Sequence, residues 1–509
     1  MNNEMVKLND PPVSPAREPV AAQPRPGSRV ALYCTLNLLF LVLLCFCGAF
    51  SGPPGHNPLP YLFLLFALCT YPLVMVRESN GRYSLLVIAG PVMFLFFGVN
   101  DLLSYFMELK GRFHSQDESL FTQGELVILG GLLCLFLGYL LAALACMGKR
   151  RLPFNSDWKT GHSALFGLFC LGIGLYATYL AQISVDYSQK VDMGSNATLI
   201  VLGRMMEPVG AVLVTYAYLK RKSTFMLALV LAIAAVKLPI GIILNSKEIG
   251  MTFAATFIIT LWVYNGKVPA RWIALFVLVV IVYFPLSYAY RAALGSKRLS
   301  VSKSLGQADT MVEKALAGNN SKRASQSGID LFAARNDYKT LVEIIVSKAG
   351  TKVKFQEGHT LAELPYAFIP RMVYPGKPVV SVGQLFNREF HISADRNTYI
   401  STSFLGEMFW NFGWAGALLG MLVMGFFWGV IGSVANIRER ATAAKVLILI
   451  SAVYLLILRF ETGLAQQTIL FMRSCLIIFL LHLIFKVREG RGLDVVIHRG
   501  VPGCPAASP

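Results

Sequence analysis

The sequence predicts an all-α integral membrane protein with about twelve transmembrane helices and one large loop that contains short helices. Of its 509 residues, 55% are hydrophobic and only 15% are charged, a balance too apolar for a soluble protein of ordinary size. Apolar stretches that can cross ~30 Å of hydrocarbon, each about 20 residues long, account for most of the chain. The basic residues gather in short segments beside these stretches, where determinants of membrane topology lie.

Apolar stretches and polar segments divide the chain into five parts. A tail covers 1–30, nine spans follow within 31–290, a polar loop covers 291–398, three more spans lie within 399–485, and a second tail covers 486–509. The twelve predicted spans are 31–50, 60–76, 84–107, 122–148, 161–184, 198–219, 225–244, 250–265, 271–290, 415–435, 444–460 and 467–485.

Charge asymmetry predicts the orientation. With the N-terminus in the cytoplasm, twenty-two Lys and Arg residues fall on the cytoplasmic side. The short loops on the other side then hold only Lys110, Arg112, Lys190 and Lys247. The positive-inside rule therefore puts both termini in the cytoplasm. The first thirty residues are rich in Pro and Arg and have no apolar core, so we expect a disordered tail and not a signal peptide.

This orientation puts the loop 291–398 outside the cytoplasm. The loop carries sixteen Lys and Arg against nine Asp and Glu, which suits an anionic partner, although a merely solvated loop is the simpler explanation. Apolar residues at helical spacing within 328–348, followed by Gly350, predict an amphipathic helix that lies against the membrane or the bundle.

Several function classes lack their signatures. The net charge of +18 does not indicate nucleic-acid binding, because the cations flank apolar stretches. The chain has no Gly-rich phosphate loop, no dinucleotide fingerprint and no HExxH motif. Its nine cysteines form no zinc or redox spacing. We therefore expect no metal and no cofactor, and no nucleic-acid partner.

Ionisable residues inside the predicted spans indicate a specific role, since burying a charge in hydrocarbon has a high free-energy cost. Counted from the outer ends of their spans, Arg204, Lys237 and Arg473 lie about 9–11 Å below the outer surface. We expect them to surround a cavity that opens outward and binds a pyrophosphate on a lipid. Two simpler explanations are side chains that snorkel to the interface and an Arg204–Glu207 ion pair. Asp101 and Arg459, with Glu461 just beyond it, are the other charges of this kind.

Four local patterns accompany this organisation: a basic turn at 244–247, Tyr-Arg at 290–291, a Pro-rich basic segment at 369–378, and SFLGEMFWNFGWAG at 403–416. Together with the order of spans and loop, which covers almost the whole chain, they resemble the Wzy-type oligosaccharide repeat-unit polymerases. These enzymes of bacterial surface-polysaccharide assembly are related in fold to the O-antigen ligases.

The resemblance implies a GT-C-like helical bundle in the bacterial inner membrane, with the large loop in the periplasm. It implies a glycosyltransferase that polymerises repeat units carried on polyprenyl pyrophosphate, giving O-antigen or exopolysaccharide. Donor and acceptor are both lipid-linked oligosaccharides, and polyprenyl pyrophosphate leaves without a nucleotide. Family members work alongside a flippase and a chain-length regulator.

The resemblance also implies roles for particular residues. A carboxylate or imidazole must take the proton of the attacking hydroxyl, and Glu407 ranks first, followed by His391 and Asp395. A helix N-terminal carboxylate explains Glu407 equally well. Cations must stabilise the charge on the pyrophosphate. The predicted cationic residues are Arg204, Lys237, Lys247, Arg291, Arg371, Lys377, Arg388, Arg459 and Arg473.

Two other functions remain open at this point. An O-antigen ligase, which transfers glycan to lipid A core, shares the outer basic cavity and the external loop. A transporter or flippase of lipid-linked sugars also needs cations inside the membrane, but its charges are expected in both leaflets and its halves are expected to be related. This chain shows neither feature, so polymerisation is favoured.

Overall fold

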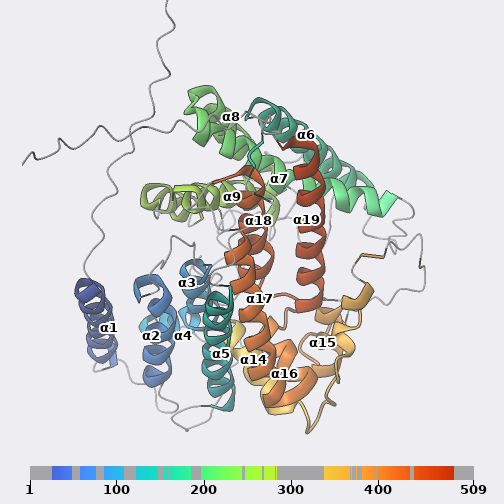
Figure 1. Cartoon of the computed structure of the whole chain (residues 1–509). Coiled ribbons are helices and arrows are strands. Elements are labelled where there is room, and N and C mark those ends of the chain that lie inside the picture. Colours follow the sequence, from blue (N-terminus) through green and yellow to red (C-terminus); the bar gives the residue numbers. More distant parts are fainter. Residues whose placement is uncertain are drawn as a thin grey trace, which may run out of the picture.

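A computed structural model describes residues 26–48, 58–75, 85–107, 122–146, 154, 156–158, 160–184, 196–243, 247–265, 269–280, 283, 337–366, 368–369, 374, 381–396, 398–435 and 441–486. Within these ranges the protein is built from helices and contains no β-strand, so the predicted all-α class is confirmed (Figure 1).

The helices follow the predicted order closely. The first nine are α1 (Pro26–Gly48), α2 (Leu59–Met75), α3 (Leu86–Phe97), α4 (Val99–Met107), α5 (Gln123–Ala145), α6 (Thr160–Ser184), α7 (Asn196–Arg221), α8 (Thr224–Ile243) and α9 (Lys247–Asn265). A short apolar helix follows at Ala270–Val280. The rest are α14 (Tyr338–Lys348), η2 (His359–Leu361), η3 (Leu364–Tyr366), α15 (Val382–Phe390), α16 (Phe404–Ala415), η4 (Gly416–Gly420), α17 (Met421–Val434), α18 (Ala443–Ala452), η5 (Val453–Ile457) and α19 (Leu464–Phe485).

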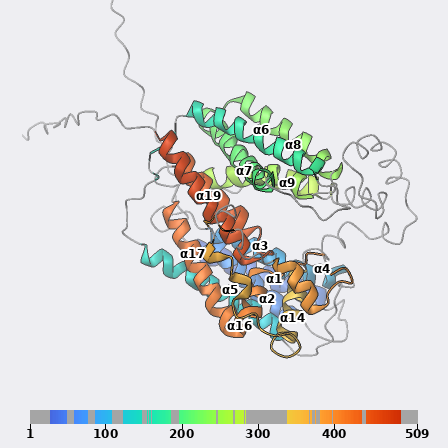
Figure 2. The same ribbon diagram turned by 90° about the vertical axis from the view of Figure 1, so that its right-hand side faces the viewer.

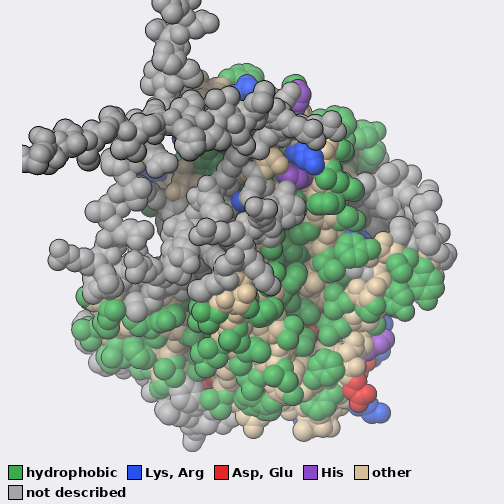
Figure 3. All heavy atoms as spheres, viewed as in Figure 1, with side chains coloured by type: hydrophobic (Ala, Val, Ile, Leu, Met, Phe, Trp, Pro, Cys, Tyr) green, Lys and Arg blue, Asp and Glu red, His purple; other side chains and the backbone are tan. Residues whose placement is uncertain are grey.

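Each of the twelve predicted spans overlaps a helix, and among the described residues five helical segments are long and apolar enough to cross a membrane. The described face in Figure 3 is mostly hydrophobic, as expected for a surface in contact with lipid. Exposed leucines and isoleucines such as Leu165 and Ile484, the latter 71% exposed, contribute to this apolar surface. The five segments are Gln123–Ala145, Gly161–Thr178, Thr224–Ile242, Phe404–Val434 and Leu464–Phe485.

Two boundaries differ from the sequence prediction. The third predicted span is broken at Gly98, where α3 ends and α4 begins. The tenth starts eleven residues earlier than predicted, at Phe404, because Ser403 caps α16 by accepting a hydrogen bond from the Gly406 N–H. α16 is kinked at Phe412 and Gly413, and a positive φ of 59° at Gly413 favours glycine there. Glu407 therefore lies inside a helix and not in a segment before it.

The helices form two groups, each with its own hydrophobic core (Figures 1 and 2). The smaller core lies within α6 to α9 and includes Phe253 and Phe257. The larger core lies among α1 to α5 and α14 to α19 and includes Trp410 and Trp428. α7 and α9 contribute side chains to both cores, and α18 contacts α7 and α9, so the two groups are joined.

Glycines allow a close contact between α5 and α17 in the larger group. A Cβ on Gly138 would lie 2.0 Å from the Leu422 carbonyl oxygen, and a Cβ on Gly425 would lie 1.8 Å from the Leu135 carbonyl oxygen. Only glycine fits at both positions, because the two backbones touch. Such close approach through small residues is typical of membrane helices, where van der Waals packing replaces the hydrophobic drive between helices.

Polar contacts join several segments at the end of the molecule where α7 and α19 finish. Asp157 accepts hydrogen bonds from the Tyr216 hydroxyl at 2.9 Å and pairs with Lys220 at 3.2 Å. The Trp158 indole N–H donates to His482 Nδ1 at 3.1 Å, on the last turns of α19. These segments, together with the start of α18, are ones that the sequence predicts to be cytoplasmic. We call this the α19 C-terminal end.

We expect Gly425→Ala to lower the thermal stability of the protein. The added methyl overlaps the α5 backbone, and overpacking of this kind costs about 1–3 kcal/mol. Gly172→Ala is the matched control, because Gly172 lies on α6 with nothing within 4 Å of its Cβ position. Thermal unfolding in detergent measures both. Equal melting temperatures for the two variants would contradict the packing argument.

Candidate functional site

The polar segment between the ninth and tenth predicted spans places a helix, α14, against the apolar helices. Asp337 caps α14 by accepting hydrogen bonds from the Thr340 N–H at 3.2 Å and the Thr340 hydroxyl at 2.8 Å. Val342 and Ile345 on α14 are fully buried in the larger core. The predicted amphipathic helix is thus confirmed for its second half, and it lies against the bundle through α3, α5 and α16. The first part of that prediction, 328–336, lies outside the described residues.

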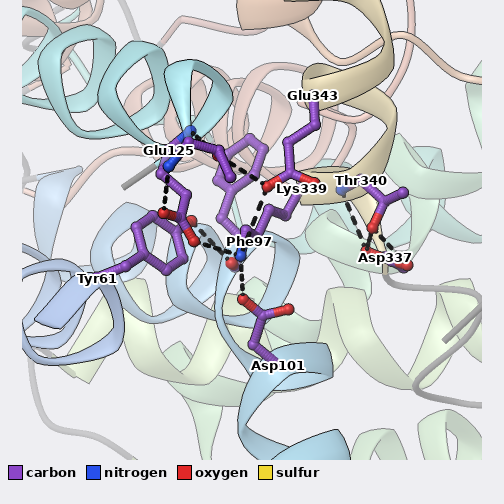
Figure 4. A network of polar contacts seen from close by, with 9 residues as sticks. Tyr61, Phe97, Asp101, Glu125, Asp337, Lys339, Thr340 and Glu343 are labelled. Atoms are coloured by element: carbon purple, nitrogen blue, oxygen red, sulfur yellow. Dashed lines mark hydrogen bonds and ion pairs between the residues drawn. The ribbon is translucent and has the colours of Figure 1, made fainter. Parts of the chain in front are cut away.

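Lys339 of α14 reaches into a buried group of carboxylates (Figure 4). Its ammonium lies 2.5 Å from Asp101 Oδ2 on α4, 2.5 Å from Glu125 Oε1 on α5 and 3.6 Å from Glu343 Oε1 on α14. It also lies 4.6 Å from the centre of the Tyr61 ring, a cation–π distance. We call these five residues the Lys339 cluster. It joins segments more than two hundred residues apart in the sequence.

The carboxylates of the Lys339 cluster are held by further hydrogen bonds. Glu125 Oε2 accepts from the Thr122 N–H at 2.9 Å and completes a capping box at the start of α5. The Thr122 hydroxyl donates to Glu343 Oε1 at 3.1 Å. α14 comes this close to α5 because position 124 is glycine: a Cβ there would lie 2.5 Å from Glu343 Cγ.

The Lys339 cluster has more negative than positive groups, since three carboxyls surround one ammonium. Burial raises the pKa of Glu343 to about 7, although Lys339 opposes the rise. Burial also raises the pKa of Asp337, at the start of α14, to about 6. Burial disfavours the ammonium of Lys339, but the three carboxylates outweigh burial and raise its pKa. Lys339 is therefore charged, and the cluster favours binding a proton near neutral pH.

A second group of polar residues forms where the turn after η5 meets α14 and α16. The Tyr338 hydroxyl donates to Glu461 Oε2. The backbone of this turn is fixed to the start of α16, because the Ser403 N–H donates to the Glu461 carbonyl oxygen at 2.8 Å. Arg459 Nη2 donates to the Tyr454 hydroxyl at 3.1 Å, and its guanidinium lies 5.3 Å from that ring's centre. The Arg459 guanidinium interacts electrostatically with the Glu461 carboxylate.

Glu407 lies next to this turn but is fully buried, with 0% of its surface exposed. Its Oε2 accepts a 2.6 Å hydrogen bond from the N–H of Leu464, the first residue of α19. Its Oε1 has no partner of normal hydrogen-bond geometry among the described residues, although the Thr360 hydroxyl interacts with the carboxyl group. Asn411, one turn later, donates to the Glu407 carbonyl and to Thr360, both at 2.7 Å. Glu407 therefore caps α19 from a neighbouring helix.

Tyr399 completes the group. Burial raises the pKa of its hydroxyl, the carboxylates of Glu407 and Glu461 raise it further, and the Gly463 N–H lowers it. Its ring lies where a Cβ on Gly383 would be 2.7 Å away, so the start of α15 packs against it. We call Tyr338, Tyr399, Glu407, Arg459 and Glu461 the Glu461 cluster. It combines two carboxylates, a guanidinium and two phenols.

The other predicted proton acceptors lie at the far end of α15. His391 ends that helix with a positive φ of 52° and is exposed. Asp395 Oδ2 accepts from the Thr398 hydroxyl at 2.9 Å, and the Asp395 carbonyl accepts from Asn387 at 2.7 Å. Arg388 is exposed, and its Nε lies 3.4 Å from the Gln384 carbonyl oxygen. The hydrogen bonds described for Asp395 and Arg388 are with residues of α15 and of the segment that follows it.

The predicted cations are distributed over several elements. Lys237 of α8 forms a buried ion pair with Glu207 of α7. From the sequence, Glu207 was considered as an ion-pair partner of Arg204. Arg204 lies on α7, and Lys247 begins α9. Arg473 is half-buried on α19. Of the described side chains in this set, only Arg459 lies in the Glu461 cluster. Arg291, Arg371 and Lys377 lie outside the described residues.

The site residues predicted from the sequence did not include Glu461, Tyr338 or Lys339. The positions of two charges could have pointed to these sites. Glu461 comes two residues after Arg459 at the end of an apolar run, and Asp101 is a charge inside a predicted span. The partner of Asp101 was not deducible, because Lys339 lies 238 residues later in a different type of segment.

Comparisons with known proteins do not identify the chain: no family model matches it, and neither a curated protein nor a solved structure does.

We expect Glu343→Gln to reduce the pH dependence of stability between pH 5 and pH 8, while the part contributed by Asp337 remains. A carboxyl whose pKa rises from 4.5 to about 7 on folding binds protons as the chain folds. The free energy of unfolding then falls as pH rises through this range. The loss of stability that Glu343 causes is complete above about pH 7, where its carboxyl is ionised. Glutamine retains an acceptor for the Thr122 hydroxyl without the charge, so the variant should melt above the wild type at pH 8.

Thermal unfolding across this pH range measures the effect. Glu357→Gln is the control, because Glu357 is an exposed carboxylate in the same segment of the chain. A Glu343→Gln variant with the same pH profile as the wild type would contradict the charge balance of the Lys339 cluster.

Proposed function

We propose that the protein polymerises oligosaccharide repeat units carried on polyprenyl pyrophosphate into a surface polysaccharide. In this reaction a hydroxyl of the acceptor sugar attacks the anomeric carbon of the donor. The bond between that carbon and the pyrophosphate oxygen breaks, and its electron pair leaves with polyprenyl pyrophosphate. A protein group takes the hydroxyl proton. The family resemblance of the sequence is the basis for the substrate class.

The observation that carries the proposal is the docking of α14 at the end of the apolar helices. The phenol of Tyr338, from the long polar segment, contacts Glu461 beside Arg459. A polymerase of lipid-linked sugars requires a site formed by a polar segment and the ends of apolar helices, because the sugars lie in water while the lipid and pyrophosphate lie at the membrane. A carboxylate suits proton transfer, and a guanidinium suits a phosphate group.

Proton acceptance and anion binding are the two roles that the residues must fill. Among the described cations, Arg459 is best placed for the pyrophosphate, since it lies in the cluster that holds the carboxylates. The anion-binding roles of the other predicted cations, and the base roles of His391 and Asp395, remain part of the proposal. Lys237 fits an anion site less well, because Glu207 already neutralises it.

The bacterial inner-membrane location rests on the family resemblance, and the arrangement of the described segments supports an orientation with both termini in the cytoplasm. Segments that the sequence predicts to be cytoplasmic meet through Asp157 and Trp158 at the α19 C-terminal end. Segments predicted to be periplasmic, including α14 and the turn with Glu461, meet at the opposite end of α19. The Glu461 cluster would then face the periplasm, where a flippase would deliver the lipid-linked repeat units.

The purified protein, incubated with lipid-linked repeat units and without nucleotide or metal, should produce a ladder of longer glycans. Sizing the products by gel or mass spectrometry checks this. Repeat units that stay single would contradict polymerisation. Their transfer to lipid A core would indicate a ligase, and their movement between leaflets of a vesicle would indicate a flippase.

We expect Arg204→Ala and Arg371→Ala each to stop chain extension while the protein still inserts into the membrane, because each removes a proposed pyrophosphate contact. Single repeats would then accumulate on polyprenyl pyrophosphate or appear as caps on lipid A. Lys352→Ala is the control, since Lys352 is an exposed cation in the polar segment. Long glycan of normal length distribution from both arginine variants would show that these cations are dispensable.

A further inference from the structure

We propose that Glu461 is the carboxylate that takes the proton from the acceptor hydroxyl, that Tyr338 positions it, and that Glu407 serves to hold the first turn of α19. This assignment rests on the proposed function. It differs from the sequence analysis, which ranked Glu407 first and left Glu461 unassigned. The two carboxylates differ in exposure, hydrogen bonding and neighbours, and each difference favours Glu461.

Exposure is the first difference. Glu407 has no exposed surface, and apolar residues of α16 such as Phe404, Leu405 and Trp410 are buried around it. A sugar hydroxyl reaches this carboxyl only if helices separate. Glu461 lies in a turn and is half-buried, so part of its surface is accessible to a bound molecule. A proton acceptor must come within about 2.6–3.2 Å of the hydroxyl oxygen, directly or through one water.

The hydrogen bonds are the second difference. Glu407 Oε2 is committed to the Leu464 N–H, and this bond satisfies one of the four N–H groups that the first turn of α19 leaves unpaired. The negative charge also lies at the positive end of the α19 dipole. Both effects give Glu407 a role in holding α16 and α19 together. The hydrogen bond to the Glu461 carboxylate comes instead from a side chain, the Tyr338 hydroxyl.

The third difference is what surrounds the two groups. Arg459, two residues before Glu461, provides a positive charge that acts on this carboxylate. Tyr338 comes from α14, and its ring packs edge-on to Phe96 at 5.2 Å, so its hydroxyl is held in place. α14 is in turn fixed by the Lys339 cluster (Figure 4). The polar segment therefore contributes to the site a residue that orients the acceptor carboxylate.

The chemical step is balanced with these groups alone. The acceptor oxygen forms a bond to the anomeric carbon of the donor as the carbon–oxygen bond to pyrophosphate breaks. The electron pair of the broken bond leaves with polyprenyl pyrophosphate, and the proton of the acceptor hydroxyl moves to Glu461. The protonated carboxyl then returns the proton to water before the next cycle.

Glu461→Gln and Glu407→Gln form a matched pair that tests the assignment. Glutamine retains oxygen for the contact with Tyr338 or with the Leu464 N–H, but it does not accept a proton at neutral pH. We expect Glu461→Gln to lower kcat for glycan extension by about 10²–10⁴-fold, the usual contribution of a general base, with KM nearly unchanged. Glu407→Gln should lower kcat less than Glu461→Gln does, and Glu407→Ala should lower the melting temperature through loss of the cap.

Tyr338→Phe removes only the hydroxyl that contacts Glu461 and keeps the ring packed against Phe96. We expect kcat to fall about tenfold while KM and the melting temperature stay near wild type, which a purely structural role would not produce. If Glu461→Gln does not fold, Tyr338→Phe still tests the assignment. The melting temperature of every variant is measured to separate a loss of folding from a loss of catalysis.

The possible outcomes separate the two proposals. If the wild type extends glycans and Glu461→Gln does so at a similar rate, the Glu461 assignment is overturned and the proposed function stands. If Glu407→Gln is as slow as the general-base range predicts, Glu407 is the acceptor. If the wild type gives no extension, the proposed function fails and the assignment fails with it.

Discussion

The contact between Lys339 and the carboxylates of Asp101, Glu125 and Glu343 is the interaction on which the rest of the candidate site depends. It fixes α14, a helix from a polar segment, to helices of the apolar bundle. Isolated buried charges are costly, and the cluster offsets that cost by pairing and by the hydrogen bonds from Thr122. Tyr338 directly precedes Lys339, so the contacts of Lys339 also hold the Tyr338 hydroxyl against Glu461. The short helix α14 therefore carries both the structural anchor and a residue of the proposed site.

Packing requirements and electrostatics act together in this arrangement. Gly124 lets α14 approach α5 closely enough for Glu343 to enter the cluster, and Gly406 leaves room for Ile345 on the other side. The glycines at 138 and 425 do the same for α5 and α17. Membrane helices gain little from hydrophobic burial against one another, so close backbone contact and internal polar pairs supply the specificity of association. A larger residue at Gly124 would move Glu343 away from the Lys339 cluster.

Much of the fold was predictable from the sequence, because apolar runs of span length and the caps around them are local signals. The helical class and a helix ending before Gly350 follow from composition and spacing alone. The break at Gly98 and the early start of α16 were missed, although the Ser403 cap of α16 is a local signal. Of the site, Glu407 and Arg459 were predicted as residues of interest, but their surroundings were not. Glu207 pairs with Lys237 and not with a neighbour on its own helix, because partners across helices are set by packing, which sequence spacing does not reveal.

The way α19 is anchored has a mechanical consequence. Its first residue is held by Glu407, and its last turns are held by Trp158 through His482. The helix has 22 residues, which at 1.5 Å each gives a rod of about 33 Å, close to the thickness of a hydrocarbon core. Because both ends of α19 are held by hydrogen bonds, a shift of one end acts on the other end as well. A displacement of the turn that holds Glu461 would therefore be transmitted along α19 to the Trp158 indole at the other end of the helix.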